Sequence, residues 1–397
     1  MLDSLLHRLR AWSGSAPQTD TTYALALSGG GARAAYQAGV LQYIAESFPH
    51  AHFEVTTGVS AGAINTAHLA NYPGAFPAAA TSLADSWSAI RTETILEPAS
   101  NLSLLRRIVP WPSRGGADAE DALAASGEGA LIDTTRLRAY LNETLHAENG
   151  FLTQVTDKIQ AGTLKACAVI TTNYMTGQTV VWVQGADVSQ WERPKRIGIN
   201  TAISVDHIMA STALPFLFPA IRIGDAWYGD GGIRLTAPLS PAIHLGADRI
   251  LAISTRYQVS RAEADQPTIA GYPPMAQIMG QLMNAIFLDT LDQDARMLER
   301  INALIETLPP AKRAPWRPLR LLLLRPSCDI GKLAGEHDVH LSGPLGFFSR
   351  GVGSEQTRSP DWLSMLLFEP SYVGRLLEIG YGDARRQHGA IEAFLEV

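Results

Sequence analysis

Residues 23–70, YALALSGGGARAAYQAGVLQYIAESFPHAHFEVTTGVSAGAINTAHLA, contain the pattern that decides the fold. The apolar run Tyr23–Leu27 predicts a short buried strand, and the glycines after it break that strand sharply. Apolar residues at helical spacing predict a helix from Arg33 to Phe48. A second strand at 53–56 and, after a tight turn, a second helix at 63–70 follow. This repetition of strand, turn and helix predicts parallel strands in a layered α/β domain.

Further elements of both kinds are predicted along the rest of the chain. The predicted strands are 164–171, 179–184, 249–254 and 319–324. The predicted helices are 131–145 and a short one from 208, with helical regions at 275–308 and 362–393. We interpret the apolar stripe on 275–308 as core or subunit packing. Residues 107–128 are rich in small and acidic residues, and we interpret them as a mobile insertion.

Composition and charge limit the class of protein. The chain has 397 residues, of which 46% are hydrophobic and 18% charged, so it can bury a core and is not expected to be disordered. Its net charge of −6 predicts no basic face for nucleic acid. Cys167 and Cys328 lie in apolar stretches and lack the spacing of a zinc site. We expect no nucleic-acid partner and no metal.

The first twenty residues, MLDSLLHRLRAWSGSAPQTD, predict a helix followed by a linker. They lack the apolar core and cleavage site of a signal peptide, and no run approaches the roughly 18 apolar residues of a spanning helix. We therefore expect a cytoplasmic protein. The helical spacing of leucines in this segment leaves peripheral contact with a membrane surface as an alternative.

The pentapeptide GVSAG at Gly58–Gly62 satisfies the pattern G-x-S-x-G. In this pattern a serine occupies a strained turn between a strand and a helix, and the glycines let the two backbones approach closely. Ser60 would be exposed at the start of the helix, where the helix dipole favours a developing anion. The pattern predicts a nucleophilic serine, with a tight turn capped by an ordinary serine as the alternative.

The segment SGGGAR at Ser28–Arg33 places successive glycines between the first strand and its helix. Such glycines can direct several backbone N–H groups toward one point, which in an acyl-transfer enzyme forms an oxyanion hole. A phosphate-binding loop would require Gly-Lys-Ser/Thr, which does not occur here. A dinucleotide fingerprint would require an acidic residue at the end of the second strand, whereas Glu54 opens that strand. The oxyanion hole is therefore favoured over nucleotide binding.

Asp230, within WYGDGG at 227–232, is a candidate base for the serine. The residues before it predict a short hairpin strand, and an ordinary hairpin turn is the alternative. A serine needs a base to become a nucleophile, and an α/β-hydrolase would use a histidine late in the chain. The histidines in that order are His337, His340 and His388. None lies in a visibly constrained loop, which favours Asp230 without excluding a histidine.

Together these segments resemble the patatin-like phospholipases. The resemblance rests on Gly29–Arg33, Gly58–Gly62 and Asp230–Gly232, in the order of the family, and on the block ASTALPFLFP at 210–219. It covers about residues 22–255, and LSMLLFEPSYVGRLLEIGYGDA in the C-terminal part is similar to the tails of bacterial members.

The resemblance implies a fold and a division of the chain. The fold is a three-layer α/β/α arrangement around a central, mostly parallel sheet, with a C-terminal helical region. A catalytic domain would occupy residues 21–255, with the insertion at about 107–128. The N-terminal helix and linker would occupy 1–20, and a largely helical extension at 256–397 would cover the catalytic core.

The resemblance also implies a Ser-Asp dyad without histidine. Ser60 would be the nucleophile and Asp230 the base that accepts its proton and later activates water. The oxyanion would be held by backbone N–H groups of Gly29, Gly30 and Gly31, most of all the last two. The remaining motif residues are Arg33, Gly58, Gly62, Gly231 and Gly232. Arg33 would anchor the glycine loop or face a lipid phosphate.

The implied function is a calcium-independent lipid acyl hydrolase that acts through an acyl-serine intermediate and needs no cofactor. Two alternatives remain: an acyltransferase that uses the same acyl-enzyme, and a non-catalytic lipid-binding protein. The expected partner is a phospholipid or another fatty-acyl ester, and Pro215–Phe218 is a candidate wall of its channel. Trp111, flanked by Arg106, Arg107 and Arg114, is a candidate contact with an anionic bilayer.

Overall fold

The computed structural model describes residues 21–95, 97–98, 132–186, 188–215, 217–265, 272, 275–287, 290–335 and 364–396. The predicted N-terminal helix and the insertion at 107–128, with Trp111 and its three arginines, lie outside these residues. Among the described residues, no helix is long and apolar enough to cross a membrane.

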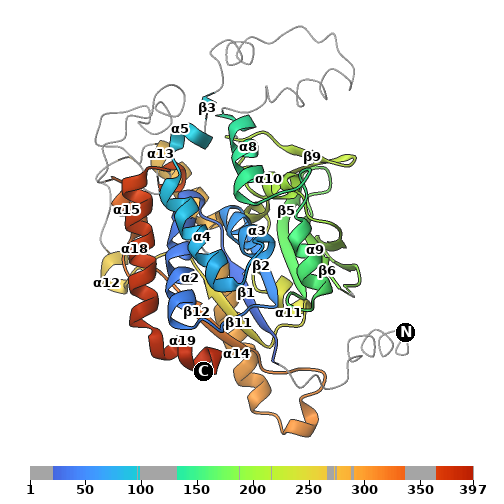
Figure 1. Ribbon diagram of the computed structural model, residues 1–397. Coiled ribbons are helices and arrows are strands. Elements are labelled where there is room, and N and C mark those ends of the chain that lie inside the picture. The colour runs from blue at the N-terminus through green and yellow to red at the C-terminus, as the bar shows by residue number, and fades with distance from the viewer. Residues whose placement is uncertain are drawn as a thin grey trace.

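One large mixed sheet forms the centre of the described structure (Figure 1). Its order is β12 (Arg320–Leu324), β11 (Arg249–Ile253), β1 (Tyr23–Leu27), β2 (Val55–Val59), β5 (Ala166–Asn173), β6 (Thr179–Gly185), β8 (Arg196–Asn200) and β7 (Trp191–Arg193). The five strands from β12 to β5 are parallel, as the sequence predicts. The hairpin of β9 (Ile221–Ile223) and β10 (Ala226–Asp230) joins the sheet antiparallel to β5. A separate small ladder pairs β3 (Glu97–Pro98) with β4 (Ile132–Asp133).

Helices cover both faces of this sheet, which gives the α/β/α layers. On one face lie α2 (Ala35–Ser47), α3 (Ala61–Asn71), α4 (Phe76–Ala89) and α18 (Pro370–Arg386), and on the other lie α11 (Ser240–His244) and α14 (Thr290–Glu306). Figure 1 shows α18 beside α2 although they are far apart in the sequence. The remaining helices are α5 (Thr92–Ile95), α8 (Thr135–Thr144), α9 (Thr153–Gln160), α10 (Val205–Ser211), α12 (Arg261–Ala264), α13 (Met275–Phe287), α15 (Ile330–Gly335), α19 (His388–Leu395) and the 3₁₀ turns Gly31–Ala34, Gly231–Ile233 and Pro310–Lys312.

Strand β1 shows why both layers are needed. Leu25 and Leu27 belong to the apolar cluster under α2, whereas Ala24 and Ala26 belong to the cluster under α14. Because successive side chains of a strand point to opposite faces, a strand that is apolar throughout requires cover on both sides. The continuous apolar run that predicts β1 in the sequence therefore also predicts a central position in the sheet.

The bounds of several predicted elements differ from those in the structure. The strand expected at 53–56 begins two residues later and continues to Val59, the residue before Ser60. The helical region expected over 275–308 consists of two helices, α13 and α14. Of the two roles expected for its apolar stripe, core packing holds only in part, and subunit packing stays a prediction. Phe287 is buried, but Ile278 and Leu282 are 38% and 51% exposed. Phe287 is buried because it reaches the turn Gly231–Ile233 from the last turn of α13.

Candidate active site

The register of three strands brings Ser60 and Asp230 to the same edge of the sheet. Val59, the last residue of β2, lies opposite Ile170 on β5. Asp230, the last residue of β10, lies opposite Thr171 on the same strand. Ser60 follows Val59 directly, so it is level with the residue that faces Asp230. Two motifs 170 residues apart in the sequence therefore converge through their pairing with β5.

Ser60 occupies a strained turn between β2 and α3. Its backbone has φ 55° and ψ −133°, which a residue with a Cβ rarely adopts unless its surroundings hold it there. The backbone N–H of Ser60 donates to Ser211 Oγ at 2.9 Å, and Ser211 Oγ donates to the carbonyl of Ile170 at 2.7 Å. This confirms the predicted turn. The predicted exposure is wrong, because Ser60 is only 4% exposed.

Asp230 is completely buried, and its backbone is fixed on both sides. Its N–H donates to the carbonyl of Ala213 at 3.0 Å, and its carbonyl accepts a hydrogen bond from Thr172 Oγ1 at 2.8 Å. In the side chain, Oδ1 accepts a hydrogen bond from the Gly232 N–H at 2.8 Å. Oδ2 has no partner of good hydrogen-bond geometry among the described residues.

Burial controls the protonation of this carboxyl group. Desolvation raises the pKa of Asp230 from 3.8 to about 7, because a buried carboxylate loses its hydration. Interaction with the side chain of Ser60 is the next largest effect and lowers the pKa, followed by the hydrogen bond from Gly232. Asp230 and Ser60 therefore interact, and the carboxyl group is poised to change charge near neutral pH.

The glycine loop lies against Ser60. A Cβ built on Gly29 would lie 2.9 Å from the Cβ of Ser60, so only glycine permits this approach. Gly30 and Gly31 have φ values of 148° and 57°, which favour glycine. Thr255 Oγ1 donates to the carbonyl of Gly29 at 2.6 Å and holds the loop from the far side. No described residue accepts a hydrogen bond from the N–H of Gly30 or Gly31.

The other motif glycines join these segments by close contacts. A Cβ on Gly62 would collide with the carbonyls of Leu27 and Ser28, so this residue brings α3 against the glycine loop. The remaining glycines likewise face close neighbours: Gly58 faces Gly62, Gly231 faces the Ile170 carbonyl and Gly232 faces the ring of Phe287. The spacing of the three motifs thus reflects one packed unit.

Arg33 is buried and does not lie at the surface. It is 3% exposed, and its Nε donates to Ser364 Oγ at 2.7 Å. Of the two roles expected from the sequence, anchoring of the loop agrees with this burial. The other expected role, contact with a lipid phosphate, stays a prediction.

A series of buried, hydrogen-bonded side chains supports the glycine loop. The sequence analysis did not identify these residues. Gln37 Nε2 donates to the carbonyl of Ser28 at 2.8 Å, and Asn65 Nδ2 donates to Gln37 Oε1 at 2.9 Å. Trp87 Nε1 in turn donates to Asn65 Oδ1 at 2.8 Å. The available signal was the presence of an amide side chain in the middle of each of two apolar helical stretches, since buried polar groups are retained when they are paired.

An apolar cavity adjoins Ser60. Its volume is about 50 Å³, and its walls come from α4, α8, the segment after α10 and residues 365–368. The lining side chains include Leu83, Trp87, Leu137, Leu214, Phe218 and Phe368. Of the wall expected at 215–218, Phe218 lines the cavity, Leu217 is buried but does not line it, and Phe216 is outside the described residues. The cavity fits an alkyl group better than a polar one.

Of the three candidate histidine bases, only His388 lies within the described residues, so a base at His337 or His340 is not tested. His388 Nδ1 lies 2.9 Å from Tyr43 Oη, and its ring stacks on Phe48, so it is engaged at the start of α19. His337 and His340 lie outside the described residues. The described part of the chain contains no group of three or more His, Cys, Asp or Glu side chains that could hold a metal ion.

The fold and this geometry define an α/β protein with a serine on a strained strand-to-helix turn beside a buried carboxylate. The family model for patatin-like phospholipase matches residues 25–243, more than half of the chain. The chain therefore belongs to the patatin-like phospholipase family, and this membership supports a lipid hydrolase activity. No curated protein matches the chain significantly.

Solved structures show more distant likeness. VipD from Legionella pneumophila is 14% identical with a TM-score of 0.35, and the match covers 96% of this chain and 67% of VipD. Human GIVD cytosolic phospholipase A2 is 13% identical with a TM-score of 0.44, and the match covers 98% of this chain and 62% of the human one. This chain thus spans about two thirds or less of those proteins, and the family assignment rests on the sequence match.

Proposed function

We propose that this chain is a lipid acyl hydrolase in which Ser60 is the nucleophile and Asp230 the general base. The observation that carries the proposal is a serine held at φ 55° that the pairing of β2 and β10 with β5 brings level with a fully buried carboxyl group. A pKa near 7 suits a base that must both accept and return a proton at neutral pH. The adjoining apolar cavity supports an acyl group as the part of the substrate that is bound.

The proposed reaction has two steps that share one base. Ser60 Oγ attacks the ester carbonyl carbon while its proton moves to Asp230 Oδ2, and the alkoxide leaving group takes up that proton as the C–O bond breaks. Water then attacks the acyl-serine and gives its proton to Asp230. The tetrahedral intermediate collapses with return of the proton to Ser60 Oγ, which releases the fatty acid.

We propose that the N–H groups of Gly30 and Gly31 hold the oxyanion in both steps, with Gly29 as the close contact to Ser60. Preorganised donors of this kind commonly contribute several kcal/mol to catalysis. The positive φ values of the two glycines and the clamp from Thr255 support this role, since they fix the loop before substrate arrives. These groups balance the charge of each step without a metal, so we expect activity without calcium.

The proposed function also implies a division of the chain. We propose that residues 21–255 form the catalytic domain and that residues 256–397 are an extension on it. The extension contributes β12 to the central sheet and α18 to the layer over α2. The proposed partner is a phospholipid or another fatty-acyl ester, with peripheral contact at a membrane surface.

Labelling with an alkyl fluorophosphonate tests the nucleophile. We expect the wild type to acquire one phosphonyl group on Ser60, detected by peptide mass spectrometry. Ser60→Ala should acquire none there, and Asp230→Asn should react much more slowly. Ser88→Ala, at the exposed end of α4, is the matched control and should be labelled like the wild type. A wild type that stays unlabelled would favour the non-catalytic lipid-binding alternative.

The acyltransferase alternative needs its own measurement, because it shares the acyl-enzyme. An added long-chain alcohol competes with water for the acyl group, and the products are the new ester or the free acid. We expect free acid to predominate. A dominant ester product at low alcohol concentration would instead identify a transferase.

A further inference from the structure

We propose that Phe368, carried by the C-terminal segment Ser364–Phe368, forms the end wall of the acyl cavity and sets the length of the acyl group. The inference deepens the proposed function and rests on it, because it assigns a specificity determinant to the same site. The segment lies about 300 residues after Ser60 in the sequence, outside the region that the family model matches.

The segment is fixed to the glycine loop at one end. Ser364 Oγ accepts the hydrogen bond from Arg33 Nε at 2.7 Å, and both side chains are buried. A Cβ on Gly31 would collide with the backbone carbonyl of Met365, so the two backbones are in close contact. The position of the segment relative to Ser60 is therefore set by direct contacts with the proposed oxyanion loop.

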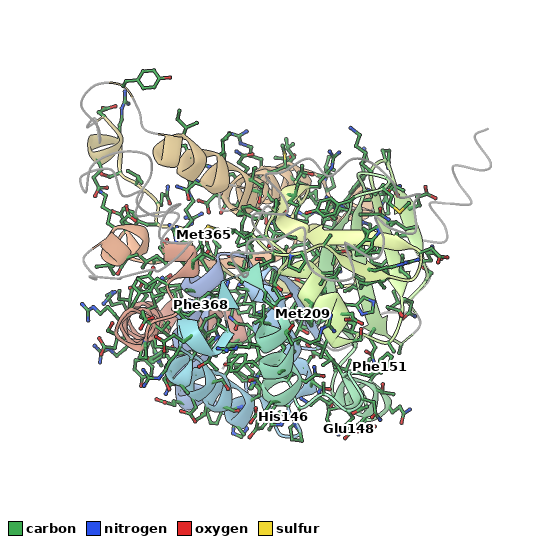
Figure 2. The ribbon with its side chains drawn as sticks, turned by 90° about the horizontal axis from the view of Figure 1, so that it is seen from above. His146, Glu148, Phe151, Met209, Met365 and Phe368 are labelled. Atoms are coloured by element: carbon green, nitrogen blue, oxygen red, sulfur yellow. The ribbon has the colours of Figure 1, made fainter. Side chains whose placement is uncertain are left out.

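Residues at the other end of the segment line the cavity. Met365, Leu366 and Phe368 line it together with Ser60. The ring of Phe368 stacks on Trp87 of α4 with centroids 6.3 Å apart and planes at 13°. Figure 2 shows Met365 and Phe368 on the same side of the molecule, away from His146 and Phe151.

The two stacked rings differ in how freely they can move. Trp87 is 4% exposed, and its indole N–H is bound to the buried Asn65, so displacing it would break a buried hydrogen bond. Phe368 has no polar atom to satisfy and is only partly buried. Of the two rings, Phe368 is therefore the one that an acyl chain can displace or that a substitution can remove.

The small volume of the cavity makes the position of Phe368 important for the length of the acyl group. A volume of about 50 Å³ holds roughly four water-sized groups, which corresponds to a short alkyl chain. A longer acyl group needs more room than this, and we assign that room to the side of the cavity that Phe368 lines. Each methylene that gains or loses its place in such a pocket changes kcat/KM by about tenfold or more.

The test compares a series of p-nitrophenyl esters from butyrate to laurate. We expect Phe368→Ala to raise the ratio of kcat/KM for decanoate over butyrate at least about tenfold, and Phe368→Trp to lower it. Phe394→Ala removes a buried ring from α19, which contacts Tyr23 at the other edge of the sheet. It is the matched control for destabilisation and should leave the ratio unchanged. Phe368→Leu replaces Phe368→Ala if the latter fails to fold.

Two results would overturn the inference: folded, active Phe368 variants with the wild-type ratio, or an equal shift of the ratio in Phe394→Ala. If the wild type hydrolyses no ester of the series, the proposed function fails, and calorimetric binding of decanoate decides the inference by itself. We then expect Phe368→Ala to bind decanoate about tenfold more tightly than the wild type. Equal affinities would contradict the role of Phe368.

Discussion

Asp230 is the residue whose environment most directly shapes the chemistry. Its carboxyl group is buried beside a serine, and a single hydrogen bond, from Gly232, reaches it with good geometry among the described residues. Sequence reasoning could select this aspartate from its glycine context but could not tell a base from a turn residue. The difference lies in desolvation, which depends on residues from several parts of the chain.

The pH dependence of activity follows from this burial. Asp230 acts as a base only when it is deprotonated, and burial raises its pKa to about 7. We therefore expect kcat/KM for a soluble p-nitrophenyl ester to rise with pH, with a midpoint near 7, and to level off above it. An acid limb centred near 4, the range of an ordinary aspartate, would contradict the account.

The stability of the folded protein should also depend on pH through Asp230, in the opposite direction to activity. Because the folded pKa lies above the unfolded value of 3.8, the folded protein binds the proton more tightly, and stability is lost as pH rises from about 4 through 7. Asp230→Asn keeps the acceptor for Gly232 but cannot ionise. We expect it to be more stable than the wild type at pH 8, on the order of a few kcal/mol, and to lose this advantage near pH 4.

Thermal unfolding at the two pH values measures this effect. Asp225→Asn, in the exposed turn between β9 and β10, is the matched control and should leave Tm unchanged at either pH. A higher Tm for Asp230→Asn of the same size at both pH values would show that packing, and not charge, is responsible.

At the scale of elements, the turn between β2 and α3 depends on how closely α3 approaches the glycine loop. The glycine spacing of GVSAG predicts this strained turn from sequence alone, and the structure confirms it. The amides of Gln37 and Asn65, which brace the loop from α2 and α3, could not be assigned a role from the sequence. Their positions in apolar helices indicate burial, but the partner of a buried amide depends on tertiary packing.

Gly62→Ala tests this close approach. The added methyl group would meet two backbone carbonyls, of Leu27 and Ser28, which cannot rotate away. We expect a loss of roughly 2–4 kcal/mol in the free energy of unfolding, measured with urea. In contrast, Gly374 lies within α18 with no atom within 4 Å of a built Cβ. Gly374→Ala should be neutral or stabilise by up to about 1 kcal/mol, and equal losses in both variants would refute the argument.

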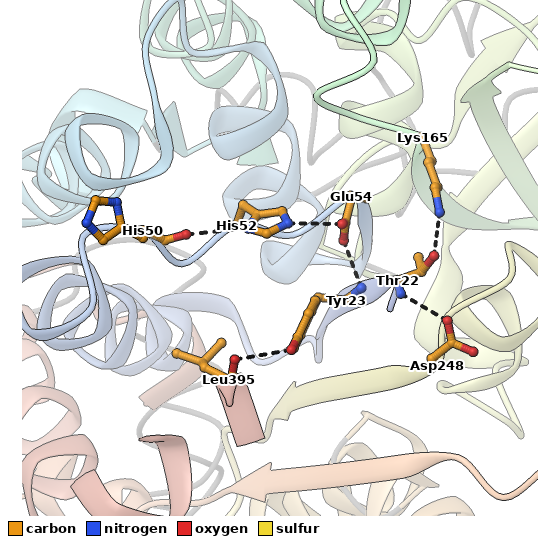
Figure 3. Close-up of polar contacts among 8 residues, drawn as sticks. All are labelled: Thr22, Tyr23, His50, His52, Glu54, Lys165, Asp248 and Leu395. Carbon is orange, nitrogen blue, oxygen red and sulfur yellow. Dashed lines mark hydrogen bonds and ion pairs between the residues drawn. The ribbon is translucent and has the colours of Figure 1, made fainter. Parts of the chain in front are cut away.

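At the scale of the whole molecule, the two ends of the strands have different roles. Figure 3 shows polar contacts at the amino ends of the strands, where the Thr22 N–H donates to Asp248 and the Tyr23 N–H donates to Glu54 at 2.7 Å. The Tyr23 hydroxyl donates to the carbonyl of Leu395 and holds the C-terminal helix. Ser60 lies at the opposite end of β2 from Glu54.

This separation predicts that stability and activity can be changed independently. Glu54→Ala removes the acceptor of the Tyr23 N–H and the partner of His52. We expect it to lower the free energy of unfolding by about 1–3 kcal/mol and to leave kcat/KM of the folded enzyme unchanged. A large loss of kcat/KM in a protein that remains folded would mean that the two ends of the strands are coupled.

The sequence gives the least information about contacts between distant parts of the chain. Alternating strand and helix signals predict the parallel strands β1 and β2, and the apolar run in β11 predicts another buried strand. Nothing in the sequence indicates that Ser364 bonds to Arg33, because the two residues are 331 positions apart. The same holds for the register through β5 that unites Ser60 with Asp230. Local periodicity predicts elements, whereas the site depends on how distant elements pair.

The most direct test of the central claim is fatty-acid release from phosphatidylcholine vesicles in the presence of a calcium chelator. The wild type, Ser60→Ala and Asp230→Asn are compared, with circular dichroism as the check that each is folded. We predict release by the wild type and a loss of about 10³-fold or more in both variants. An Asp230→Asn variant that keeps most of the activity, or a wild type that releases no fatty acid, would contradict the Ser-Asp account.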